Sequence, residues 1–172
     1  PLRFEESVQF KNLSFYYISD APLILSKINQ NIPKGSSVGI VGSTGSGKST
    51  LLDLLMGLIE PTEGDILVDG KKLTVETLNK WQKNIAHVPQ AIFLTDASMA
   101  ENIAFGVPLD KINFERVKRS AQIAQISEFI EESQEGYNTI VGERGVRLSG
   151  GQRQRIGIAR SLYKDANILV FD

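Results

Sequence analysis

The sequence predicts an α/β fold, and three of its features lead to that prediction. The glycine-rich stretch 42–50 follows a short apolar run and precedes a helical pattern, so a strand, a loop and a helix are expected in that order. The apolar runs 37–41 and 168–171 are short and continuous, as in parallel strands covered on both faces. Alternating residues near the start add an antiparallel β subdomain. We therefore expect a three-layer core carrying that subdomain and an inserted helical lobe.

Strands are expected mainly in the first half of the chain. Residues 8–17 alternate and are rich in aromatic side chains, as a half-buried strand is. Residues 23–32 predict a second strand, which the turn signal at 33–35 closes. Residues 66–70 combine an alternating pair with the Asp-Gly hairpin signal, and residues 85–88 predict one more short strand.

Apolar residues at helical spacing predict the helices. One helix follows the glycine-rich loop, a second covers residues 74–83, and the pattern is helical throughout from about Met99 to Gln134. The last helix opens at Ser149-Gly150-Gly151. The faces expected to be buried are Leu51, Leu55 and Leu58; Val117, Ala121 and Ala124; and Ile156, Ala159, Leu162 and Tyr163.

These elements predict three parts of the chain. Residues 1–91 should form the β subdomain and the core around the glycine-rich loop. Residues 92–148 are too many for a simple crossover and predict a separate helical lobe, and residues 149–172 return a helix and a strand to the sheet. Because the chain opens on Pro1 and stops at Asp172 directly after an apolar run, we expect it to be a fragment.

Composition excludes several classes of function. The 172 residues carry a formal net charge of -1, so no basic face for nucleic acid is expected. The absence of cysteine and the single histidine, His87, exclude disulfides and Cys/His zinc sites, which leaves a hard metal ion bound by oxygens. No apolar run approaches the roughly 20 residues that span a bilayer.

Residues 42–50 read GSTGSGKST, which is the Gly-x4-Gly-Lys-Ser pattern of a phosphate-binding loop (P-loop). A polyphosphate needs many converging backbone N–H donors, so the loop needs glycines, and the following helix aims its positive dipole end at the same anion. Lys48 adds a charge for the outer phosphates, and the Ser49 hydroxyl can bind Mg2+. The loop therefore predicts nucleoside triphosphate binding by a core of the P-loop NTPase type. The contacts are expected from Gly42, Ser43, Thr44, Gly45, Ser46, Gly47, Lys48, Ser49 and Thr50.

A second glycine pair stands in the stretch Leu148-Ser149-Gly150-Gly151-Gln152, named the signature motif below. Two interpretations remain open for it. In one, Ser149 caps a helix and the glycines relax a loop. In the other, the helix start is a second anion site, and one triphosphate is held between the P-loop of one copy and the signature motif of another.

Taken together, these motifs resemble the nucleotide-binding domain of an ATP-binding cassette (ABC) transporter over essentially all of the chain. The P-loop is similar to the family's Walker A motif, and LSGGQ to its signature. Residues 168–172 resemble Walker B, Val88-Pro89-Gln90 the Q-loop, and Phe15-Tyr16-Tyr17 the aromatic A-loop. Gly142-Glu143-Arg144-Gly145 resembles the X-loop of exporters.

The resemblance implies a role for each matching residue. Tyr17 would stack on adenine, Lys48 would contact the phosphates, and Gln90 and Asp172 would join Ser49 around Mg2+ and the attacking water. Ser149, Gly150, Gly151 and Gln152 would contact the ATP of a second nucleotide-binding domain, as a homodimer or pseudo-dimer. A transmembrane domain would be driven through the Q-loop and X-loop, at the cytoplasmic face of a membrane, most simply a bacterial inner membrane.

Residues 101–106 resemble the exporter type within the family. Residues 81–84 and 92–95 suggest the branch that flips lipid-linked oligosaccharides or exports polysaccharides. The family's catalytic glutamate, expected directly after Asp172, and its switch histidine are not in the sequence, so the chain should bind ATP without turning it over. Two alternatives are an ATPase of DNA repair, which would separate its cassette halves by coiled coils, and a P-loop kinase or GTPase, which has no use for LSGGQ.

Overall fold

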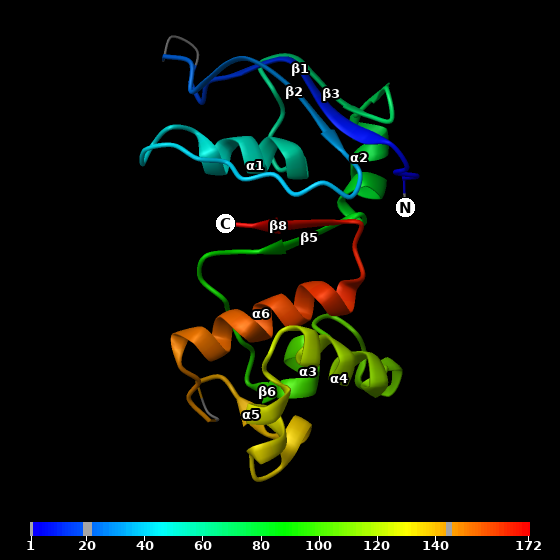
Figure 1. Cartoon of the computed structure of the whole chain (residues 1–172), viewed down its shortest axis with the longest axis vertical. Helices are drawn as coiled ribbons and strands as arrows, with labels where there is room; N and C mark the ends of the chain where they lie inside the picture. Colours follow the sequence, from blue (N-terminus) through cyan, green and yellow to red (C-terminus); the bar gives the residue numbers. More distant parts are fainter. Residues whose placement is uncertain (1, 19–21, 144–145) are drawn as a thin grey trace. The chain divides into compact units, whose positions relative to one another are not determined.

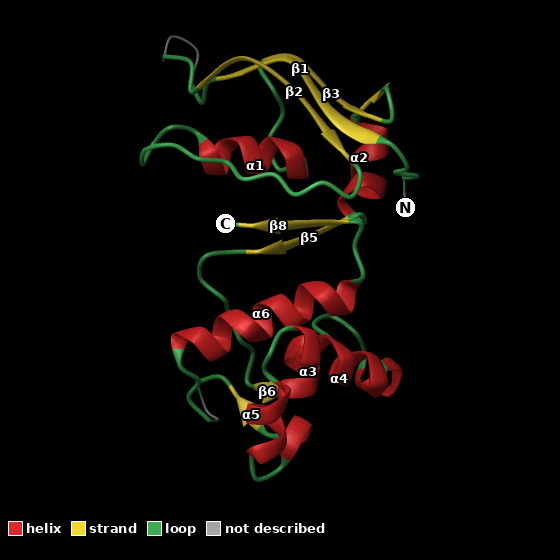
Figure 2. Cartoon of the chain, viewed as in Figure 1, coloured by secondary structure: helices red, strands yellow, loops and turns green. Residues whose placement is uncertain are grey.

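The computed structural model describes residues 2–18, 22–143 and 146–172. The chain divides into two compact units, residues 1–85 and 86–172 (Figures 1 and 2). The first unit holds β1 (Ser7–Phe15), β2 (Leu25–Pro33), α1 (Lys48–Met56), β3 (Glu63–Val68), β4 (Lys71–Lys72) and α2 (Val75–Gln82).

A four-stranded antiparallel sheet in the order β2-β1-β3-β4 forms one layer of the first unit. Val8 in the central strand β1 lies opposite Ile32 of β2 and Val68 of β3. Val8 and Val68 are both fully buried, which shows that the apolar face of the alternating pattern points into the core. The predicted α/β class with an antiparallel β subdomain is confirmed.

Helices α1 and α2 cover the core of the first unit. Trp81 of α2 is fully buried, and its indole Nε1–H donates to the Leu55 carbonyl of α1 at 2.8 Å. The predicted apolar face of α1 is only partly correct. The helix ends at Met56 because Gly57 takes a left-handed conformation at φ 65°, so Leu58 lies beyond the helix and is exposed.

The expected buried strand at residues 37–41 is wrong. No strand is formed there, and Val38 and Val41 are 53% and 93% exposed. A strand exists only where a neighbour pairs with its backbone, and the sheet of the first unit is complete without this run. The apolar run therefore enters the P-loop as an extended segment that is paired with no strand of its own unit.

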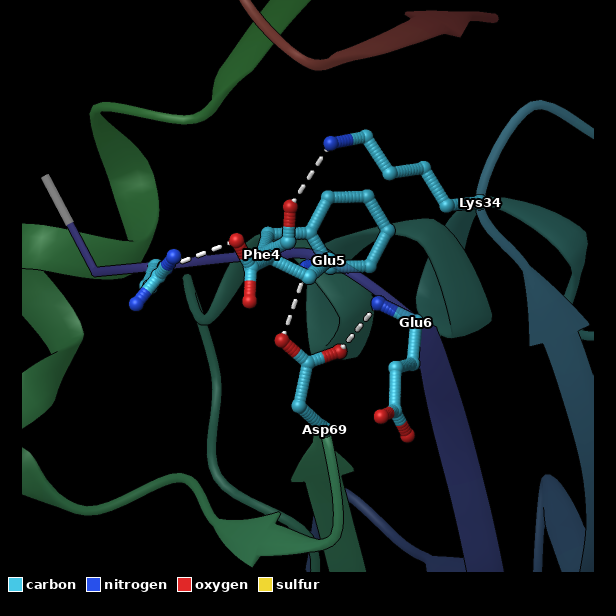
Figure 3. A network of polar contacts seen from close by, with 6 residues as sticks. Phe4, Glu5, Glu6, Lys34 and Asp69 are labelled. Carbon is cyan, nitrogen blue, oxygen red and sulfur yellow. Dashed lines mark hydrogen bonds and ion pairs between the residues drawn. The ribbon is translucent and has the colours of Figure 1, made fainter.

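The start of the chain is fastened to the first unit by polar contacts around Asp69 (Figure 3). The Asp69 carboxylate accepts backbone N–H groups from Glu5 at 2.8 Å, Glu6 at 2.8 Å and Ser7 at 3.0 Å. Burial raises the pKa of this carboxyl, but the three hydrogen bonds and the charge of Lys34 outweigh it and bring the pKa below its ordinary value.

Phe4 lies within the same network. The Lys34 ammonium donates to the Phe4 carbonyl at 2.9 Å and lies over its ring, and that ring meets Trp81 edge-on. Residues 4–7 are therefore part of the folded unit, held by both the sheet hairpin and the core.

The second unit contains the helices that follow the Q-loop. Its elements are β5 (Ile85–Val88, whose first residue closes the first unit), β6 (Ala97–Ser98), α3 (Met99–Ile103), the 3-10 helix η1 (Leu109–Lys111), α4 (Phe114–Ile123), α5 (Ser127–Glu132), the 3-10 helix η2 (Gly136–Asn138), β7 (Ile140–Val141), α6 (Gly150–Lys164) and β8 (Ile168–Phe171). Strands β5 and β8 pair and run in the same direction (Figure 1), and β6 pairs antiparallel with β7.

One hydrophobic core joins the helices of this unit. Val117 and Ala121 of α4 and Ile156 and Ala159 of α6 are all fully buried in it, as their spacing predicts. The stretch from Met99 to Gln134 is not helical throughout, because short non-helical connections separate α3, α4 and α5. Within the described ranges, every helix is too short or too polar to cross a bilayer.

Candidate functional site

The P-loop wraps around the side chain of Lys48, the first residue of α1. The Lys48 ammonium donates to the Gly42 carbonyl at 2.9 Å and to the Ser43 carbonyl at 2.8 Å. An ammonium has three donors, so two of them shape the loop and the third can meet a phosphate oxygen. The loop and its lysine thus form one cradle rather than a flexible turn.

The turn into α1 requires glycine at position 47. Gly47 has φ +88°, in the left-handed region, and a Cβ there would lie 2.9 Å from Ile24 Cγ2. No side chain caps α1, and its first turn contains no acidic residue. The N–H groups of a first helical turn have no partner inside the helix, so this end of α1 is suited to an anion.

An aromatic wall stands beside the cradle. Tyr17 lines a pocket of about 260 Å³ together with Ile24 and the P-loop residues Gly45, Gly47, Lys48, Ser49 and Thr50. The Tyr17 hydroxyl is 3.1 Å from Thr50 Oγ1, and Phe15 meets the Tyr17 ring edge-on at 4.9 Å. The ring is therefore held in place while 60% of the residue is exposed, which leaves a face on which a base can stack.

The donor set of the first unit fits Mg2+ only as a partner of phosphate. In the described part of the chain, no three His, Cys, Asp or Glu side chains cluster as a preformed metal site. Mg2+ keeps several waters and is usually bound by one or two protein oxygens plus substrate phosphates, so a single hydroxyl such as that of Ser49 is sufficient on this side.

Two predicted site residues lie close together in the second unit. Gln90 follows β5, and Asp172 follows β8, the strand beside it (Figure 1). The Asp172 backbone N–H donates to the Val88 carbonyl at 3.1 Å, two residues before Gln90. Carboxyl ends of neighbouring parallel strands share an edge, which explains why residues more than 80 positions apart meet there.

The signature motif begins α6 with a capping box. Ser149 Oγ accepts the Gln152 backbone N–H at 3.2 Å, and Gln152 Oε1 accepts the Ser149 backbone N–H at 2.8 Å. Gly150 and Gly151 have open space where a Cβ would stand. The capping interpretation is therefore correct for Ser149, and the glycines leave the backbone accessible. Of the X-loop, Arg144 and Gly145 lie outside the described residues.

Comparison with known proteins decides the family. The family model described as "ABC transporter" matches residues 25–172. The chain belongs to the ABC transporter family. It is 48% identical over 165 residues to the leukotoxin translocation ATP-binding protein LktB of Mannheimia glucosida, covering 96% of this chain and 23% of that protein.

Two further relatives agree with that assignment. The alpha-hemolysin translocation ATP-binding protein HlyB of Proteus vulgaris is 46% identical, again over 96% of this chain and 23% of its own length. A solved structure titled "Structure of a bacterial Atm1-family ABC exporter with ATP bound" has a TM-score of 0.88 and 40% identity, covering 98% of this chain and 29% of that one.

The chain thus spans about a quarter of the length of the curated relatives it matches. Their names confirm the exporter type of the resemblance. None of the three names refers to an oligosaccharide or a polysaccharide, so the narrower branch gains no support from them.

Sequence reasoning missed two kinds of residue at these sites. Ile24 lines the Tyr17 pocket, but an apolar residue at a strand edge carries no sign of such a role. Arg160 did leave a sign. It falls on the apolar face of α6, between Ile156 and Tyr163 at helical spacing, where a cation is unexpected.

Proposed function

We propose that this chain is the ATP-binding part of the motor domain of an ABC exporter. In the complete protein, two such domains would enclose two ATP molecules, and closure would drive export or lipid flipping by a transmembrane domain. The observation that carries the proposal is the P-loop cradle, in which Lys48 spans the loop carbonyls of Gly42 and Ser43 at the uncapped start of α1.

The first unit would bind the nucleotide. Tyr17 would stack on the adenine, and the backbone N–H groups of residues 42–50 would contact the phosphates with Lys48. Ser49 would supply one oxygen to Mg2+, and bound Mg2+ would neutralise charge on the phosphates. The fixed ring of Tyr17, held by Thr50 and Phe15, supports this assignment.

The second unit would complete the reaction centre. Gln90 would position the attacking water and Asp172 would act in the Mg2+ shell, and their placement at the ends of paired strands supports both roles. Ser149, Gly150, Gly151 and Gln152 would contact the ATP bound to a partner domain. The transmembrane domain would dock near the Q-loop and X-loop, which places the domain at the cytoplasmic face of a membrane.

ATP binding tests the proposal directly. We expect a fluorescent ATP analogue to bind the chain in the presence of Mg2+, and Lys48→Ala to weaken that binding at least a hundredfold, because both the loop shape and the phosphate contact depend on this ammonium. Lys71→Ala, which removes an exposed lysine of β4, is the matched control. Equal affinity of the two variants would contradict the proposed site.

A further inference from the structure

The loop that follows Gln90 is seated on α3 by Asn102, whose side chain is fully buried. Asn102 Oδ1 accepts the Thr95 backbone N–H at 3.0 Å, and Nδ2 donates to the carbonyls of Thr95 at 3.1 Å and Ser98 at 3.1 Å. A buried amide saturated in this way fixes the backbone around it, since any displacement leaves polar groups unpaired.

Arg160 of α6 holds the same loop from the other side. Its Nη2 donates to the Phe93 carbonyl at 3.1 Å, its Nε donates to the Asn102 carbonyl at 2.9 Å, and its guanidinium lies 4.5 Å from the Phe105 ring centroid. The side chain is half-buried, and burial lowers its pKa. Among the described carboxylates, none forms an ion pair with it.

An arginine that is partly desolvated without a counter-ion costs free energy compared with an apolar residue on this face. Its hydrogen bonds go to main-chain carbonyls of two other segments, so its effect is to fix their positions. Packing adds a further contact. A Cβ on Gly157 would lie 2.3 Å from Ile92 Cδ1, so the loop approaches α6 as closely as a residue without a side chain allows.

We propose that Asn102 and Arg160, named here the Asn102–Arg160 hub, are positioning residues that lock the loop after Gln90 onto the signature helix α6. Gln90 and the signature motif then move as one body. The inference rests on the proposed function only for the meaning of that movement. It also explains why residues 92–95 and 101–106 carry a distinctive pattern although none of them reaches a nucleotide in its own unit.

Amide hydrogen exchange on the whole 172-residue chain tests the hub without any nucleotide. In Arg160→Gln we expect the Thr95 amide to exchange at least tenfold faster, because hydrogen bonds from a charged donor contribute about 1.5–3 kcal/mol each. The amides of Val117 and Ile130, in the core of the same unit, should stay within twofold. Arg119→Gln, an exposed arginine on α4, is the matched control.

Arg160→Lys keeps the charge and one carbonyl contact, so its Thr95 exchange should lie between those of the original chain and Arg160→Gln. This milder variant also preserves the test if Arg160→Gln does not fold. An unchanged Thr95 amide, or equal acceleration of Thr95, Val117 and Ile130, would overturn the positioning role.

The chain has no cysteine, so two engineered ones can report the geometry. With spin labels on Ala91→Cys and Gln154→Cys, the original background should give a narrow distance distribution and Arg160→Gln a broad one. A distribution that stays narrow in Arg160→Gln would overturn the inference. Failure of the proposed function would appear separately, as absence of ATP binding by the unmutated chain.

Discussion

The helices α1 and α6 both begin after glycine-containing, anion-binding motifs, but their first turns are completed in different ways. At α1, the preceding residue Gly47 is left-handed and no side chain accepts the N–H groups. At α6, Ser149 and Gln152 close a capping box with their own side chains. A third helix, α3, has a capping box in which the partner is the carboxylate of Glu101.

The difference indicates how much each helix start depends on a ligand. An uncapped start leaves its N–H groups to whatever anion approaches, so the P-loop should bind phosphate by itself. A start that already satisfies Ser149 and Gln152 offers only the accessible backbone of Gly150 and Gly151. We therefore expect the signature motif to bind phosphate weakly alone and to act only beside an ATP already held by another copy.

The comparison is broken most strongly by a side chain at the start of α1. We expect Gly47→Ala to lower the free energy of unfolding by about 1–3 kcal/mol, because alanine at φ +88° is strained and its Cβ meets Ile24. ATP affinity should fall at least tenfold, as measured by titration. Gly35→Ala is the control, since Gly35 has φ +80° with open space around it. It should show the strain without the loss of affinity.

Removing the cap of α6 should have a smaller effect, confined to stability. Ser149→Ala is expected to lower the free energy of unfolding by about 1 kcal/mol in urea titration, since one capping side chain is lost. Ser127→Ala at the start of α5, where no side chain caps the helix, should change it by less than about 0.5 kcal/mol. Equal losses in the two variants would mean that the capping box contributes nothing.

Filling the open space at Gly151 should act in the opposite direction. Gly151→Ala lies inside α6 with nothing within contact distance, so we expect a gain of up to about 0.5–1 kcal/mol in unfolding free energy. Thermal unfolding measures this gain. A loss of stability would show that the backbone there is not accessible, and with it that the proposed partner contact has no room.

The carboxylate cap of α3 should make a small part of the stability depend on pH. Hydrogen bonds from the Ser98 side chain and backbone lower the pKa of Glu101 from its ordinary value of 4.5. The folded state then binds the proton less readily than the unfolded state, so this contribution is present above about pH 4.5 and is lost as pH falls through the lower folded pKa. Unfolding of Glu101→Gln compared with the original chain should differ more at pH 7 than at pH 3.

Most local elements were predictable from the sequence. The β5 run at residues 85–88, the β8 run at 168–171 and the buried faces of α4 and α6 follow from periodicity and from turn residues. The strand expected at residues 37–41 failed because an apolar run specifies burial or pairing without specifying the neighbour. Leu58 failed for a local reason, since Gly57 ends the helix one residue earlier.

The sites were predictable to the extent that they depend on short motifs. Lys48 and the loop glycines stand together in the sequence, so their cradle was visible in it. The hub was not, because Asn102 and Arg160 are 58 positions apart and meet only through the packing of α3 on α6. The one sign was the cation on an apolar helical face.

The fastening of the first residues around Asp69 has a mechanical consequence. A pull on residue 2 would act on the hydrogen bonds from Asp69 to residues 5–7 and, at the same time, on the bonds from Lys34 to Phe4 and from Asn84 to Leu2. Bonds that share a load resist it together, whereas bonds opened one after another do not. Tension arriving at the start of the chain would therefore pass into the sheet and α2 of the first unit before residues 2–7 could peel away.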